Sequence, residues 1–126
     1  MRQITKHIIH CSDSDFGDVN LIRQWHIDRG WHDIGYHFVI RTDGTIEMGR
    51  TLEQSGAHAY GYNRESVGTC LIGTDIFSEA QFRSLRELHS TLESLFPGLT
   101  YHAHNEFNSF KTCPNFDVQQ TMELEA

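Results

Sequence analysis

The apolar residues of this 126-residue chain change their spacing several times along the sequence. Runs of β-branched and aromatic residues at 6–11, 36–41 and 66–73 are typical of buried strands. Between these runs, apolar residues recur at helical spacing over 21–29 and 82–95. Strands that alternate with helices favour a sheet covered by helices. The sequence therefore predicts one α/β domain over residues 1–126, with a central mixed β-sheet flanked by helices.

Local signals predict where these elements begin and end. Asp18 has the position of an N-cap for the first helix, and Gly30 is a typical helix stop. Ser78 and Gln81 have the spacing of a capping box before the second helix. The Asp43-Gly44 pair predicts a tight turn between two antiparallel strands.

Charge and hydropathy exclude several classes of partner. The net charge is −7, and Lys and Arg do not gather in any one segment, whereas binding to phosphates requires a basic surface. The chain has no apolar run of about 18 residues and no signal-peptide pattern at its start. We therefore expect no nucleic-acid partner, no stable membrane association, synthesis in the cytoplasm without a signal peptide, and a monomer.

The three cysteines are widely separated, and their odd number argues against a disulfide framework. Cys11 and Cys70 lie in apolar strand segments, where a thiol usually acts as a small hydrophobic side chain. Cys113 lies in a polar segment near Lys111, which would favour a thiolate. Cys113 is therefore the cysteine for which a chemical role is predicted.

The segment "HAHNEFNSFKTCPNF", residues 102–116, has neither helical nor strand periodicity. A catalytic zinc site usually has three protein ligands and one open position. His10 at the end of the first strand, one of His102 and His104, and Cys113 form a candidate set. Histidines near strand ends are also common as hydrogen-bonded structural residues, so spacing alone leaves a metal site and a structural role both open.

Several segments taken together resemble a known family. They are "IIHCS", "IRQWHIDRGWHDIGYHFVIRTDGTIEMGR", "GAHAYGYNRESVGTCLIG" and "AHNEFNSFKTCPNFD". In this order they are similar to the zinc N-acetylmuramoyl-L-alanine amidases of the type 2 amidase and peptidoglycan-recognition-protein family, from about residue 7 to about residue 118. The resemblance implies that family's fold, one Zn²⁺ per chain, and peptidoglycan as substrate.

The resemblance also implies roles for individual residues. His10, His104 and Cys113 match the family's zinc ligands. Tyr36 and Lys111 match two further catalytic positions of the phage enzymes in the family.

Other histidines are assigned by the resemblance or by alternation. His58 matches a histidine that lines the family's substrate cleft. On a strand His102 and His104 would face the same way, so only the resemblance selects His104. Alternation along the strand predicts that His37 faces away from Tyr36, toward the core. No role beyond surface or helix packing is predicted for His7, His26, His32 and His89.

The implied activity is hydrolysis of the amide between the lactyl group of N-acetylmuramic acid and L-alanine. A phage or prophage endolysin would do this in the cell wall, after membrane permeabilisation or assisted export. The alternative is a non-catalytic peptidoglycan-binding or polymerase-inhibiting protein of the same fold. One phage enzyme of the family inhibits RNA polymerase partly through an amino-terminal extension that this sequence lacks, so the resemblance does not support RNA polymerase binding here.

Overall fold

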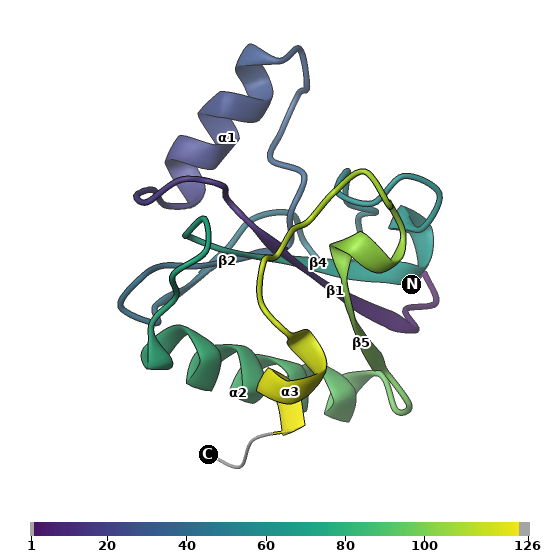
Figure 1. Ribbon diagram of the computed structural model, residues 1–126. Coiled ribbons are helices and arrows are strands. Elements are labelled where there is room, and N and C mark those ends of the chain that lie inside the picture. Colours follow the sequence, from purple (N-terminus) through teal and green to yellow (C-terminus); the bar gives the residue numbers. More distant parts are fainter. Residues whose placement is uncertain (1, 124–126) are drawn as a thin grey trace.

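The computed structural model describes residues 2–123 and contains one five-stranded sheet with the order β3-β2-β4-β1-β5 (Figure 1). The central strand β4 (Ser66–Leu71) is parallel to both β1 (Lys6–Cys11) and β2 (Phe38–Ile40). Strand β5 (Thr100–Ala103) is parallel to β1, and β3 (Ile46–Met48) is antiparallel to β2. The sheet is therefore mixed, as predicted.

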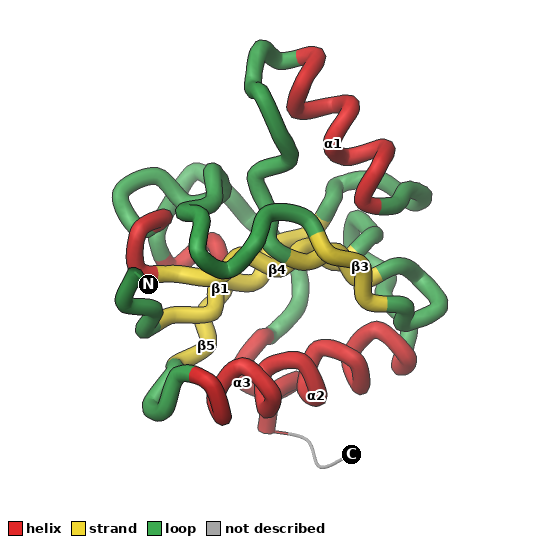
Figure 2. The backbone as a smooth tube through the Cα atoms, turned by 180° about the vertical axis from the view of Figure 1, so that it is seen from behind, coloured by secondary structure: helices red, strands yellow, loops and turns green. Residues whose placement is uncertain are grey.

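Helices cover both faces of the sheet. Helix α1 (Val19–Asp28) lies on one face, and α2 (Glu79–Leu95) and α3 (Val118–Glu123) lie on the other, as Figures 1 and 2 show. Two short 3₁₀ turns, η1 (Asn63–Glu65) and η2 (His104–Glu106), precede β4 and follow β5. The predicted fold class is confirmed. None of the helices among residues 2–123 has the length and apolar character needed to cross a bilayer.

Each face of the sheet has its own apolar cluster, because successive strand residues point to opposite sides. Ile9, Phe38 and Leu71 belong to the cluster beneath α2, and Val39 and Cys70 to the cluster beneath α1. The strands of the middle of the sheet are buried throughout, which explains why they are almost continuously apolar.

The predicted helix and turn signals are confirmed. The Asp18 side chain accepts a hydrogen bond from the Leu21 N–H at 2.8 Å, and Ser78 forms a reciprocal capping box with Gln81. The Gly44 N–H donates to the Arg41 carbonyl at 2.8 Å and closes the predicted turn. One detail differs: Leu95, expected in the apolar stripe of α2, is 60% exposed because the helix ends there, beyond the sheet.

Candidate metal centre and active-site cleft

Strand register brings two of the predicted ligands together. Ile9 of β1 is paired with Ala103 of β5, so the residues that follow them, His10 and His104, lie side by side at the same edge of the sheet. Their ring centroids are 4.3 Å apart. With Cys113, they form a group whose ligand atoms all lie within 4.8 Å of one another, and which could hold a metal ion.

The loop that carries Cys113 is tied to the end of β1. The Cys11 N–H donates to the Cys113 Sγ at 2.8 Å, and the Asn105 N–H donates to the Cys113 carbonyl at 3.1 Å. Farther along, the Asn115 side chain donates to the Thr74 carbonyl at 2.6 Å. Cys11, which was predicted to be an inert apolar residue, therefore also supports the candidate ligand.

The Cys113 thiol is held in its protonated form when no metal is present. The neighbouring Cys11 thiol and burial both raise the pKa of Cys113 far above its ordinary value. A metal ion reverses this, because a coordinating thiol loses its proton. Sulfur and imidazole nitrogen are ligands that zinc prefers, and a group of three protein ligands leaves a position open. The donor set therefore fits zinc.

A chain of hydrogen bonds leads from His10 to the loop before β4. His10 Nε2 lies 2.8 Å from His58 Nδ1, and His58 Nε2 lies 3.3 Å from the Ser66 hydroxyl. That hydroxyl donates to the Tyr62 carbonyl at 2.8 Å, since a carbonyl can only accept. Ser66 must therefore accept from His58 Nε2–H, which makes His58 Nδ1 an acceptor and His10 Nε2–H a donor. The chain leaves the lone pair of His10 Nδ1 free to bind a metal.

The histidines of the centre are kept neutral, as metal ligands must be. Burial lowers the pKa of His10 and of His58 well below 6.5, and neighbouring histidines lower it further. Burial also lowers the pKa of His104, and the Lys111 ammonium adds to that effect. Lys111 lines the same hollow as His10, His104 and Cys113, so its positive charge lies close to the candidate metal centre.

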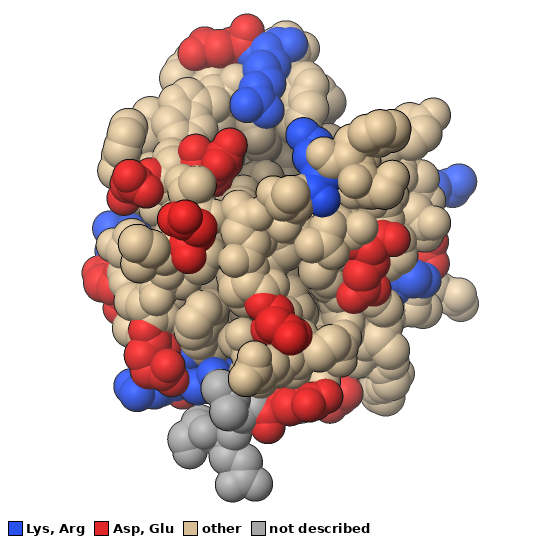
Figure 3. Space-filling model, viewed as in Figure 1, with Lys and Arg blue, Asp and Glu red and all other residues tan. Residues whose placement is uncertain are grey.

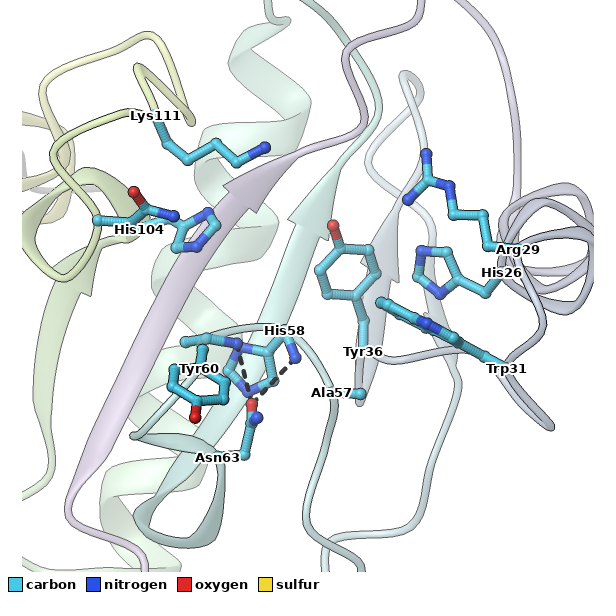
Figure 4. Close-up of a pocket in the computed structure, with 12 residues that line it drawn as sticks. His26, Arg29, Trp31, Tyr36, Ala57, His58, Tyr60, Asn63, His104 and Lys111 are labelled. Atoms are coloured by element: carbon cyan, nitrogen blue, oxygen red, sulfur yellow. Dashed lines mark hydrogen bonds between the residues drawn. The ribbon is translucent and has the colours of Figure 1, made fainter.

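Tyr36 stands over the same group. Its ring centroid is 5.0 Å from that of His10, and burial raises the pKa of its hydroxyl well above 10. The hydroxyl therefore keeps its proton at neutral pH and can donate a hydrogen bond. In Figure 4 this hydroxyl points into the cavity, with His104 and Lys111 on one side and Arg29 on the other.

The prediction that His37 faces away from Tyr36 is wrong. Strand β2 begins only at Phe38, so the alternation does not extend back to Tyr36. The His37 ring lies 5.9 Å from that of His58, on the same side of the sheet as Tyr36. His37 is nevertheless a buried structural residue: its Nδ1 accepts from the Gly68 N–H and its Nε2 bonds to the Gln54 carbonyl.

The structure also separates His102 from His104. Strand β5 ends at Ala103 and η2 begins at His104, so the two side chains do not share a strand face. His102 bonds to the Thr100 hydroxyl and to the Glu106 carboxylate, each at 2.7 Å. His104 instead lies beside His10.

Three of the remaining histidine predictions, those for His7, His26 and His89, are incomplete. His26 lines the cleft, with its ring 4.5 Å from that of Trp31 and 5.5 Å from that of Tyr36. His7 of β1 and His89 of α2 form a buried pair between the sheet and the helix, with their Nδ1 atoms 3.0 Å apart. Helical spacing at His26 indicated burial, but it could not show that the end of α1 forms a cleft wall.

A cleft of about 440 Å³ adjoins the candidate metal centre (Figure 4). A second hollow of about 320 Å³ contains His10, Cys11 and Cys113, and it shares four lining residues with the first. The shared residues are Arg29, Tyr36, His104 and Lys111. The candidate metal centre therefore opens into a space large enough for an extended ligand.

Comparison with known proteins identifies the family of the chain. The sequence matches the N-acetylmuramoyl-L-alanine amidase family over residues 1–116. The chain belongs to this family. It is 43% identical to the endolysin of Escherichia phage T7 over 126 aligned positions, which cover 91% of this chain and 83% of the phage protein. The resemblance noted in the sequence is thus confirmed.

Solved structures of amidase-family proteins share the fold. The N-acetylmuramoyl-L-alanine amidase LysC from Clostridium intestinale URNW matches with a TM-score of 0.89 and 29% identity, covering 95% of this chain and 83% of LysC. The Drosophila recognition protein PGRP-LB matches with a TM-score of 0.81 and 28% identity, over 90% of this chain and 76% of PGRP-LB. The amidase type 2 and peptidoglycan-recognition fold is therefore established for this chain.

Proposed function

We propose that this protein is a zinc-dependent peptidoglycan amidase that hydrolyses the amide between the lactyl group of N-acetylmuramic acid and L-alanine. The observation that carries the proposal is the convergence of His10, His104 and Cys113 at the base of a cleft, in a chain of the N-acetylmuramoyl-L-alanine amidase family. A peptidoglycan-binding protein without activity would not require a third metal ligand beside the cleft.

The three residues would hold one Zn²⁺ per chain. His10 would bind through Nδ1, because its Nε2–H is committed to His58. When bound, zinc supplies Lewis-acid activation of water and of the scissile carbonyl. The remaining chemistry belongs to the side chains around it.

Lys111 and Tyr36 are the proposed catalytic residues. The Lys111 ammonium lines both hollows, and it would stabilise negative charge as this charge develops on the carbonyl oxygen. The Tyr36 hydroxyl keeps its proton, so it can orient the attacking water or pass a proton toward the leaving amine. His58 acts through His10 as a positioning residue.

The biological setting follows from the same proposal. The T7 relative is an endolysin, and we infer that this chain also acts on the cell wall, which it would reach after membrane permeabilisation or assisted export. Peptidoglycan would be its partner, and the protein would act as a monomer.

The decisive experiment measures the release of L-alanine amino termini from purified peptidoglycan, with and without a chelator. We expect release that the chelator abolishes and added zinc restores. His104→Gln should lose zinc and activity together, whereas His102→Gln, two residues away, should keep both. Chelator-resistant release would rule out the metal mechanism. The absence of release by zinc-loaded protein would rule out the amidase.

A further inference from the structure

The cleft carries positive charge in a protein whose net charge is −7. Arg29 and Lys111 both line the two hollows, and Figure 4 shows them on opposite sides of Tyr36. In Figure 3, Lys and Arg side chains lie at the edge of a hollow on this face. Among the described residues that line the two hollows, Asp13 is the only acidic one.

Arg29 is not neutralised within the described part of the chain. The ion pairs formed by residues 2–123 do not include Arg29, and its guanidinium donates no hydrogen bond to them. The neighbouring Asp28 carboxylate accepts a hydrogen bond from Gln24 at 2.8 Å instead. An exposed guanidinium without a protein partner is available to an anionic ligand.

The backbone of Arg29 is held in place by the end of α1. Its N–H donates to the carbonyls of Trp25 and His26, and the Trp31 N–H also donates to His26. Burial and then the Arg29 guanidinium lower the pKa of His26 to about 4, so His26 is neutral and adds no charge. Arg50 also lowers the pKa of His26, but its guanidinium donates to the Ile34 and Ser55 carbonyls. Arg29 is therefore the cation that lines this side of the cleft.

We propose that Arg29 binds the free α-carboxylate of the second residue of the peptidoglycan stem peptide; this rests on the proposed amidase function. The lactyl carboxyl of the sugar forms the scissile amide and carries no charge. The free carboxylates of a muramyl peptide therefore belong to its peptide. Lys111 lies beside His104, where the reacting carbonyl would bind, and Arg29 lies across Tyr36 from it. The peptide would therefore extend from the metal centre toward α1. A guanidinium matches a carboxylate through two parallel hydrogen bonds.

The test uses two muramyl tripeptides that differ in one group. The second stem residue carries a free α-carboxylate in one and a carboxamide in the other, and every other carboxyl is amidated. The zinc-loaded wild-type protein should show a kcat/KM about tenfold higher for the acid, in line with a charge-assisted hydrogen bond. The preference should shrink with added salt, because exposed charges are screened.

Variants assign the preference to Arg29. Arg29→Gln should cleave both substrates at nearly the same rate, and Arg29→Lys should retain part of the preference. Arg83→Gln, the same substitution at an exposed position on α2, should keep the wild-type ratio. Equal rates of the wild-type protein on both substrates, or an unchanged ratio in Arg29→Gln, would overturn the assignment while leaving the amidase intact. Failure to cleave either substrate would instead contradict the proposed function.

Discussion

The His10 Nε2 and His58 Nδ1 atoms are 2.8 Å apart, and the hydrogen bonds beyond them determine which of the two donates. Because His10 is the donor, its Nδ1 is presented to the candidate metal centre. Loss of such a partner typically weakens metal binding by about 10–100-fold. We therefore expect His58→Ala to lower zinc affinity by that factor, measured by competition with a chelator of known affinity.

His102→Ala is the matched control for this measurement. His102 is also hydrogen-bonded on both ring nitrogens, but its partners lie away from the centre. The zinc affinity of the His102→Ala protein should remain at the wild-type value. If His58→Ala binds zinc as tightly as the wild type, the orienting role is wrong.

Gly68 provides an independent test of the same ring. A Cβ atom at this position would lie 2.5–2.6 Å from three atoms of the His58 imidazole, which is too close for van der Waals contact. Gly68→Ala should therefore displace His58 and weaken zinc binding, and overpacking should reduce the free energy of unfolding by about 1–3 kcal/mol. Chelator competition and urea denaturation measure the two effects. The control is Ala57→Gly, on the cleft rim. A Gly98→Ala variant is unsuitable, because the positive φ of Gly98 would strain the backbone of an alanine there.

Zinc binding should release about one proton at neutral pH. The imidazoles of His10 and His104 are already neutral, because burial lowers the pKa of both, so neither releases a proton when it binds zinc. The Cys113 thiol, whose pKa is raised, must lose its proton on binding. Calorimetric titrations in two buffers of different ionisation enthalpy count the protons. Zero protons released would mean that Cys113 is already a thiolate or is not a ligand.

Lys111→Ala and Tyr36→Phe should each lower turnover while zinc content stays near one per chain. Removal of a charge-stabilising donor costs about 10²–10³-fold in kcat, and loss of a general acid about 10²–10⁴-fold. Amide hydrolysis and metal analysis on the same preparations test both statements. Loss of zinc in either variant would refute its assignment as a catalytic residue that does not bind the metal.

Acid should destabilise the fold through its buried histidines. Burial lowers the pKa of His37 to about 4, and it lowers the pKa of His7 well below 6.5. The unfolded chain therefore binds these protons first, and stability falls as the pH drops below about 6.5 toward 4. His37 alone would account for about 3 kcal/mol at the acid end of this range.

Urea denaturation in the presence of chelator, at several pH values from 8 to 4, measures this loss without a contribution from metal release. NMR titration of the His37 ring gives its pKa directly. A free energy of unfolding that stays constant across this range would contradict the prediction.

Most of the fold could be predicted from residues close together in the sequence. The apolar spacing of the strands and helices, the N-caps Asp18 and Ser78 and the Asp43-Gly44 turn depend on the backbone and its immediate neighbours. These signals are local, so they can be recognised without knowledge of the tertiary structure. The family resemblance added candidate ligands, but it could not give their geometry.

What the sequence by itself determined was the set of elements and the chemistry available at their ends. Only the tertiary structure decided which side chains meet, because strand register joins residues about a hundred positions apart. The end of β5 at Ala103 separates His104 from His102, and the start of β2 at Phe38 leaves Tyr36 and His37 on one side. The direction of the His10–His58 hydrogen bond depends on the Tyr62 carbonyl in the same stretch as His58, but His10 lies 48 residues earlier, so only the tertiary structure joins the two rings.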